Sequence, residues 1–139
     1  MNPFEKLLGE KATLLADGAT GTTFFGLGLQ SGDAPELWNV DFPERVALHY
    51  QAFIDAGSDL VLTNSFGGTR YRLKLHQAEL RVVELNIAAA TILREVVDSC
   101  GREVIVAGSI GPTGEILAPL GDLQAEDAIS AFAEQALAL

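Results

Sequence analysis

The sequence predicts an α/β protein in which parallel strands alternate with helices, and three observations predict it. Short apolar runs typical of strands occur at residues 13–16, 59–66 and 103–108. Each run ends beside a glycine and small polar residues, and a longer amphipathic segment comes later in the chain. The resulting order, β-α-β-α-β-α, is typical of parallel strands joined by right-handed crossovers.

The three predicted strands differ in how strongly the sequence marks them. Residues 13–16 (TLLA) are short and end at Asp17, whereas residues 59–66 (DLVLTNSF) form a longer run that ends at two glycines. Residues 103–108 (EVIVAG) are almost continuously apolar. Such a run is expected for a strand of a parallel sheet that is buried on both faces.

The predicted helices follow from apolar residues spaced three or four apart. The first begins at Pro43, near its first turn, and ends before Gly57, with Val46, Tyr50 and Ile54 on one face. Two more helices are predicted over residues 78–99 and from about Gln124 to the end of the chain, with Asp122 as a cap. The segment around Trp38 is predicted to be a loop.

Two architectures fit this order of elements: an open doubly wound sheet and a segment of a (β/α)₈ barrel. The last predicted helix has no C-cap and no following strand. We therefore expect residues 1–139 to be part of a larger domain, truncated within a helix. Unpaired edges of such a sheet would favour self-association.

The composition limits the classes of partner. A net charge of −10 argues against nucleic-acid binding and against docking on an anionic membrane. No apolar run is long enough to span a bilayer, and the N-terminal residues do not resemble a signal peptide. Cys100 is the only cysteine, so no intrachain disulfide can form, and we expect a cytoplasmic protein.

Candidate functional residues gather in three clusters at the predicted strand ends, where ligands of parallel βα folds bind. The clusters are residues 17–22 (DGATGT), 63–68 (TNSFGG) and 108–114 (GSIGPTG). Glycine lets the backbone approach a ligand, and free backbone N–H groups can hold an anion such as a carboxylate. None of the clusters has the spacing of a dinucleotide or phosphate-binding loop.

The roles of individual side chains in these clusters stay open on spacing alone. Asp17 is either an acceptor for a substrate ammonium group or the cap of an Asp-Gly turn. Asn64 either contacts a ligand or caps its loop. His49, His76 and Cys100 have no neighbours at metal-ligand spacing, so we predict neither metal ligands nor catalytic residues.

Three segments taken together resemble one family. They are LLADGATGT (14–22), WNVDFPERVALHYQAFIDAGSDLVLTNSFGGTRYRL (38–73) and GSIGPTGEIL (108–117). They resemble the first half of the homocysteine S-methyltransferase domain, found also in methionine synthase and betaine–homocysteine methyltransferase. Each segment alone is a weak signal, whereas the set at this separation is specific.

The resemblance implies a (β/α)₈ TIM barrel, of which this chain holds about the first three βα units. It also implies methyl transfer from a small-molecule donor to the sulfur of homocysteine, which zinc would hold as a thiolate through three cysteines. The amino-acid end of homocysteine would then contact Asp17, Gly18, Ala19, Thr63, Asn64 and Ser65.

The chain departs from the family pattern in one important respect. The family's zinc cysteines lie in later strands, and Cys100 matches none of them, so the resemblance implies no zinc site and no activity for this chain alone. A self-associating half-barrel and a small flavodoxin-like binding domain are the alternatives. Leu80 lies early in a predicted helix where a polar residue is expected, so it either meets a partner or marks a substitution. The sequence does not indicate the methyl donor.

Overall fold

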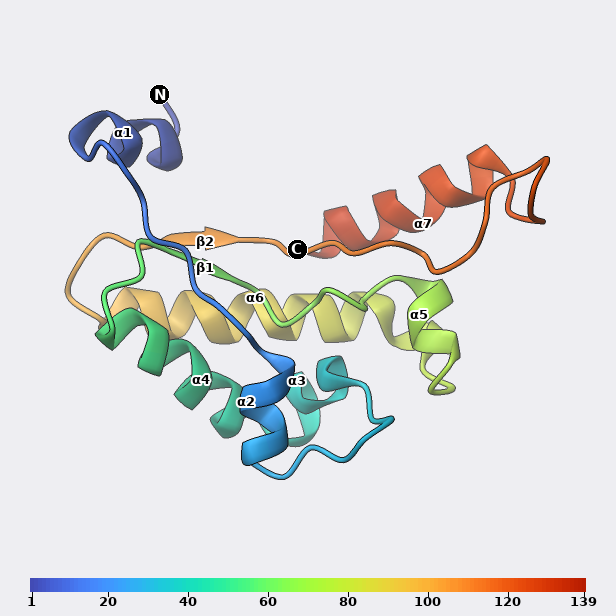
Figure 1. The fold of residues 1–139 in the computed structure, drawn as a ribbon, viewed down its shortest axis with the longest axis horizontal. Helices are drawn as coiled ribbons and strands as arrows, with labels where there is room; N and C mark the ends of the chain where they lie inside the picture. The colour runs from blue at the N-terminus through green and yellow to red at the C-terminus, as the bar shows by residue number, and fades with distance from the viewer.

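Two parallel strands lie at the centre of the computed structural model, which describes all residues 1–139 (Figure 1). Strand β1 (Leu60–Leu62) pairs in parallel with β2 (Ile105–Ala107). The first predicted strand contributes a single parallel bridge between Ala16 and Leu60. Three segments therefore lie side by side in sequence order, and the prediction of an α/β protein with parallel strands is confirmed.

Both strands are shorter than their apolar runs because the backbone leaves the ladder early. The N–H of Thr63 still donates to the carbonyl of Ala107 at 2.9 Å. Beyond it the hydrogen bonds become local, because Ser65 donates to the carbonyl of Thr63 and Gly68 to that of Ser65, both at 2.9 Å. The cluster at residues 63–68 is therefore a tight turn at the carboxyl end of β1.

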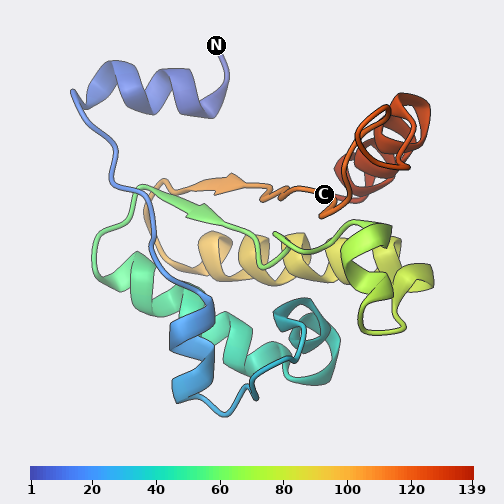
Figure 2. The same ribbon diagram turned by 45° about the vertical axis from the view of Figure 1, so that its right-hand side comes forward.

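Helices cover one face of the sheet. In both ribbon views α4 (Pro43–Asp55) and α6 (Val82–Ser99) lie along the same side of the strands, and α7 (Ala125–Ala138) packs on α6 (Figures 1 and 2). The three predicted helices are confirmed, although α7 begins after Gln124, without a side-chain cap, instead of after Asp122.

Several short helical segments were not predicted. They are α1 (Pro3–Glu10), α2 (Gly21–Gly26), α3 (Trp38–Asp41), α5 (Arg70–Lys74) and the 3₁₀ turn η1 (Pro35–Leu37). The helix predicted over residues 78–99 begins with a second 3₁₀ turn, η2 (Glu79–Arg81), before α6. The prediction of a loop at Trp38 is thus wrong, because this residue begins α3 and is buried. It packs on Phe24 of α2 and joins the main core between the sheet, α4 and α6.

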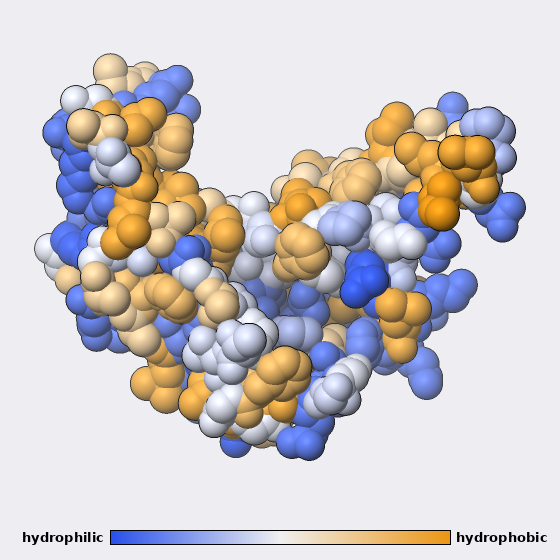
Figure 3. All heavy atoms as spheres, in the orientation of Figure 1, coloured by the Kyte–Doolittle hydropathy of each residue, from blue (hydrophilic) through white to orange (hydrophobic).

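The opposite face of the sheet carries no helical layer. Adjacent strand residues point to opposite faces: Val61 is fully buried toward the helices, whereas Leu62 is 41% exposed on the other side. In the space-filling view a broad notch separates the end formed by α1 from the end formed by α7 (Figure 3). Leu80, in η2, is 97% exposed and has no apolar neighbour to cover it. No helix has both the length and the apolar character needed to cross a membrane.

Candidate functional site

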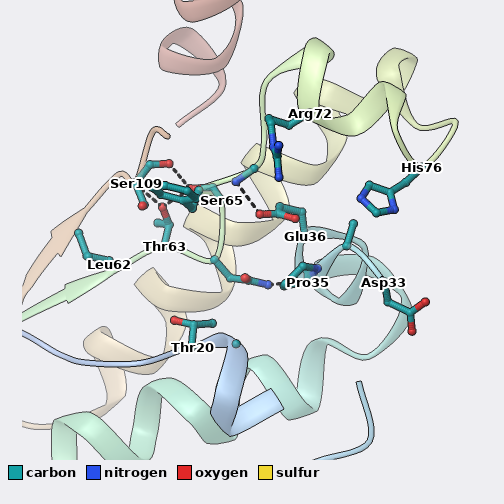
Figure 4. A pocket seen from close by; sticks show the side chains of 15 residues that line it. Thr20, Asp33, Pro35, Glu36, Leu62, Thr63, Ser65, Arg72, His76 and Ser109 are labelled. Carbon is teal, nitrogen blue, oxygen red and sulfur yellow. Dashed lines mark hydrogen bonds between the residues drawn. The ribbon is translucent and has the colours of Figure 1, made fainter. Parts of the chain in front are cut away.

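A pocket of about 420 Å³ lies at the carboxyl ends of β1 and β2 (Figure 4). All three predicted clusters contribute to it. Its lining consists of Thr20, Gly21, Asp33, Ala34, Pro35, Glu36, Leu62, Thr63, Asn64, Ser65, Phe66, Gly67, Arg72, His76 and Ser109. Of the six predicted substrate-binding residues, Thr63, Asn64 and Ser65 line this pocket, whereas Asp17, Gly18 and Ala19 precede its lining residue Thr20 in the chain and do not line it.

Hydroxyl groups join the two strand ends at the wall of the pocket. The hydroxyls of Thr63 and Ser65 lie 2.6 Å apart, and that of Ser65 donates to the carbonyl of Ser109 at 2.8 Å. The N–H of Ser109 donates back to Oγ1 of Thr63 at 2.9 Å. Because the Ser65 proton is used at Ser109, Thr63 must donate to Ser65. This closed circuit fixes the relative position of β1 and β2.

The amide group of Asn64 is hydrogen-bonded within the chain. Its Nδ2 donates to the carbonyl of Pro35 at 2.8 Å and to Oδ1 of Asn39 at 2.9 Å, and Asn39 donates back to the carbonyl of Asn64 at 2.8 Å. The N–H of Asn64 donates to the hydroxyl of Tyr50 at 2.6 Å. Burial raises the pKa of Tyr50, so this hydroxyl stays neutral. Asn64 therefore fixes the strand end against the preceding loop.

Asp17 holds its carboxylate at the end of the first predicted strand. One oxygen, Oδ2, accepts from the N–H of Leu62 at 3.2 Å, whereas Oδ1 is buried and has no hydrogen-bond partner. Burial raises the pKa of this carboxyl group. Gly18 and Ala19 are exposed, and their backbone N–H groups have no acceptor within the chain. An unpaired acceptor and two unpaired donors thus lie in consecutive residues.

Charged and titratable side chains also line the pocket. Glu36 is 6% exposed, and its Oε1 accepts from the N–H of Gly67 at 2.6 Å. Arg72 of α5 and His76, just beyond it, point into the same space (Figure 4). The sequence offered no signal for Glu36, which lies in η1 and does not follow a predicted strand. Only the basic character of residues 70–81 marked the segment that carries Arg72 and His76.

The residues of this chain do not fit a zinc site of three cysteines. No three His, Cys, Asp or Glu side chains gather closely enough to hold a metal ion. The sulfur of Cys100 lies 3.3 Å from the carbonyl of Arg102, just beyond the end of α6 and away from the pocket. Zinc ligation by this chain therefore has no structural support.

His49, next to the pocket on α4, makes the stability of the fold depend on pH. The ring is 2% exposed, lies beside Phe24 and Phe53, and has no partner at Nδ1. Burial lowers its pKa from 6.5. Between the folded and unfolded pKa values the unfolded chain binds the proton and the folded chain does not, so stability falls as the pH drops below about 6.5.

We expect urea denaturation to show a lower free energy of unfolding at about pH 5.5 than at about pH 8. The control is the variant His49→Phe, which lacks the imidazole but keeps every other titrating group of the wild type. An identical pH dependence in wild type and His49→Phe would contradict this assignment.

Comparison with known proteins shows which family this chain is similar to. The sequence model of the homocysteine S-methyltransferase family matches residues 14–139. The chain is 30% identical over 135 residues to methionine synthase of Mycobacterium tuberculosis, in an alignment that covers 91% of this chain and 11% of that protein. It is 28% identical over 144 residues to homocysteine S-methyltransferase YbgG of Bacillus subtilis, in an alignment that covers 94% of this chain and 45% of YbgG.

A solved structure shows the same relationship. The homocysteine methyltransferase MmuM of Escherichia coli, in its metallated form, superposes with a TM-score of 0.69 at 26% identity, covering 81% of this chain and 42% of MmuM. The chain thus spans less than half the length of the relatives it matches. The family match contains all three strand-end clusters that form the pocket. This chain belongs to the homocysteine S-methyltransferase family.

Proposed function

We propose that this chain forms the homocysteine-binding part of a homocysteine S-methyltransferase, which transfers a methyl group from a small-molecule donor to the sulfur of homocysteine. One observation carries the proposal: the unpaired carboxylate oxygen of Asp17 adjoins the unpaired N–H groups of Gly18 and Ala19. An amino acid presents an ammonium group and a carboxylate. These unpaired groups are complementary to both charges.

Each predicted residue has a role in this proposal. Asp17 accepts a hydrogen bond from the ammonium group, and the N–H groups of Gly18 and Ala19 donate to the carboxylate. Thr63 and Ser65 hold the wall of the pocket through their hydroxyl circuit. Asn64 holds the end of β1 against the segment that contains Pro35 and Asn39, because its amide group donates hydrogen bonds to both residues.

We further propose that the chain is the N-terminal part of a (β/α)₈ barrel. The strand segments are parallel neighbours in sequence order, as in a barrel wall. A doubly wound domain carries helices on both faces of its sheet, whereas here α4 and α6 lie on the same face. The exposed Leu62 on the uncovered side is suited to a barrel interior.

The part of the reaction that this chain supports is binding of the amino-acid end. Its residues do not fit a zinc site, so they do not supply the group that activates the homocysteine sulfur. The methyl donor is a second small molecule, and the net charge of −10 gives no support for nucleic-acid binding. We place the protein in the cytoplasm on the basis of its single cysteine.

The substitution Asp17→Asn tests the proposal. It keeps the shape of the side chain but removes the negative charge, so the affinity for L-homocysteine should fall about tenfold or more. Because burial already raises the pKa of Asp17, a neutral amide should not lower the melting temperature. Titration calorimetry under reducing conditions measures the first effect and thermal denaturation the second.

Two comparisons sharpen this test. The variant Asp98→Asn changes an exposed carboxylate near the end of α6 and should leave the affinity unchanged. The ligand 3-aminopropanethiol lacks the carboxylate of homocysteine and should bind more weakly than homocysteine to the wild type. Absence of homocysteine binding to the wild type, or equal binding by Asp17→Asn, would refute the proposal.

A further inference from the structure

A buried glutamine on α7 reaches the strand ends that form the pocket. Gln135 is fully buried, and its Nε2 donates to the carbonyl of Ser65 at 2.6 Å and to Oδ1 of Asn86 at 3.0 Å. The carbonyl of Ser109 lies 3.5 Å from the same nitrogen. An amide NH₂ has two protons, so the two shorter contacts account for its donors. Gln135 thus bonds to the backbone of a pocket residue far away in the sequence.

We infer that Gln135 is a positioning residue, which holds the carboxyl ends of β1 and β2 in the arrangement that binds homocysteine. This inference rests on the proposed function for its ligand. Gln135 does not line the pocket, so it acts on the ligand only through other residues. It acts through Ser65, whose carbonyl it holds and whose hydroxyl donates to Ser109.

A second amide completes the attachment. Asn86 of α6 is 1% exposed, and its Nδ2 donates to the carbonyl of Gly68 at 3.0 Å and to that of Val82 at 2.7 Å. Its Oδ1 accepts from Gln135. Carbonyls of the turn after β1, which strand pairing leaves free, are therefore satisfied by two side chains from different helices. The position of the turn is therefore fixed by hydrogen bonds from α6 and α7.

The position of Gln135 on its helix supports a specific role. The buried residues of α7 are Ala128, Ala131 and Gln135, spaced as one helix face that packs inward. An apolar residue is the usual occupant of such a position, and burial of an amide is costly unless its hydrogen bonds are made. The Oε1 atom of Gln135 has no partner. The two alanines offer little side chain to fix the helix laterally, so the amide supplies the directional contact.

The substitution Gln135→Met tests the inference, because methionine keeps the length of the side chain and removes both donors. We expect the affinity for L-homocysteine to fall about tenfold. In the absence of ligand, hydrogen exchange at the amide of Ser109, which donates to Thr63, should become faster relative to that of Val61 in β1. Titration calorimetry and NMR hydrogen exchange measure these effects.

The matched control is Ala131→Gly, which weakens the same helix face without changing any of these hydrogen bonds. It should lower the melting temperature but keep the homocysteine affinity within about twofold. The inference is overturned if Gln135→Met leaves the exchange of Ser109 unchanged, or if both variants lose affinity in proportion to stability. Failure of the wild type to bind homocysteine would refute the proposed function instead, and the exchange of Ser109 would still decide the role of Gln135.

Discussion

Replacing Phe24 by alanine is expected to destabilise the protein by about 3–5 kcal/mol, the usual cost of removing a buried phenylalanine. Phe24 is fully buried, and its ring lies 5.1 Å from that of Trp38 and 5.0 Å from that of His49. Small domains have a total stability of about 5–15 kcal/mol, so one substitution would remove a large part of it. Urea denaturation followed by fluorescence of Trp38, the only tryptophan, measures the loss directly.

The adjacent residue provides the control for this substitution. Phe25 lies in the same helix, α2, but is 52% exposed. Its replacement by alanine should change the stability by no more than about 1 kcal/mol. Because α2 follows the segment 17–19 directly, Phe24→Ala should also weaken homocysteine binding. If Phe24→Ala and Phe25→Ala lowered the free energy of unfolding equally, the assignment of Phe24 as the core contact of α2 would be wrong.

The contrast between α2 and α4 explains which parts of the fold the sequence could predict. In α4, Val46, Tyr50 and Ile54 recur with helical spacing and mark the helix without tertiary information. Helix α2 has only six residues and begins and ends at a glycine, and a helix of that length has no stability of its own. It forms because Phe24 docks on Trp38. That contact joins two segments that sequence periodicity treats as separate loops.

The same distinction holds for the pocket. Thr63 to Ser65 could be placed because ligand sites of parallel sheets lie at strand ends, and the strand itself was recognisable. Glu36 and Arg72 could not, because neither follows a strand, and only the folding of η1 and α5 toward the turn brings them together. Gln135 occupied an alanine-rich run that predicted a helix but gave no indication of its hydrogen bonds.

The substitution Gly68→Ala is expected to destabilise the protein by about 1–3 kcal/mol, as overpacking of a well-packed site does. A Cβ atom at this position would lie 2.6 Å from Oδ1 of Asn86, 2.6 Å from Nε2 of Gln135 and 2.9 Å from the carbonyl of Ser65. The backbone of Gly68 does not have a positive φ, so the cost comes from lack of space. Because the displaced groups hold the turn after β1, homocysteine affinity should fall as well.

Gly9 supplies the control for this effect, because a Cβ atom there would meet nothing within 4 Å and the residue lies in α1. Gly9→Ala should leave the affinity unchanged and stabilise the helix by up to about 1 kcal/mol. Combining Gly68→Ala with Gln135→Ala tests the mechanism, since the shorter side chain vacates part of the space that the new methyl group needs. The combined destabilisation should then be smaller than the sum of the single effects by at least about 0.5 kcal/mol. Strict additivity would mean that Gly68 and Gln135 do not share one packed network.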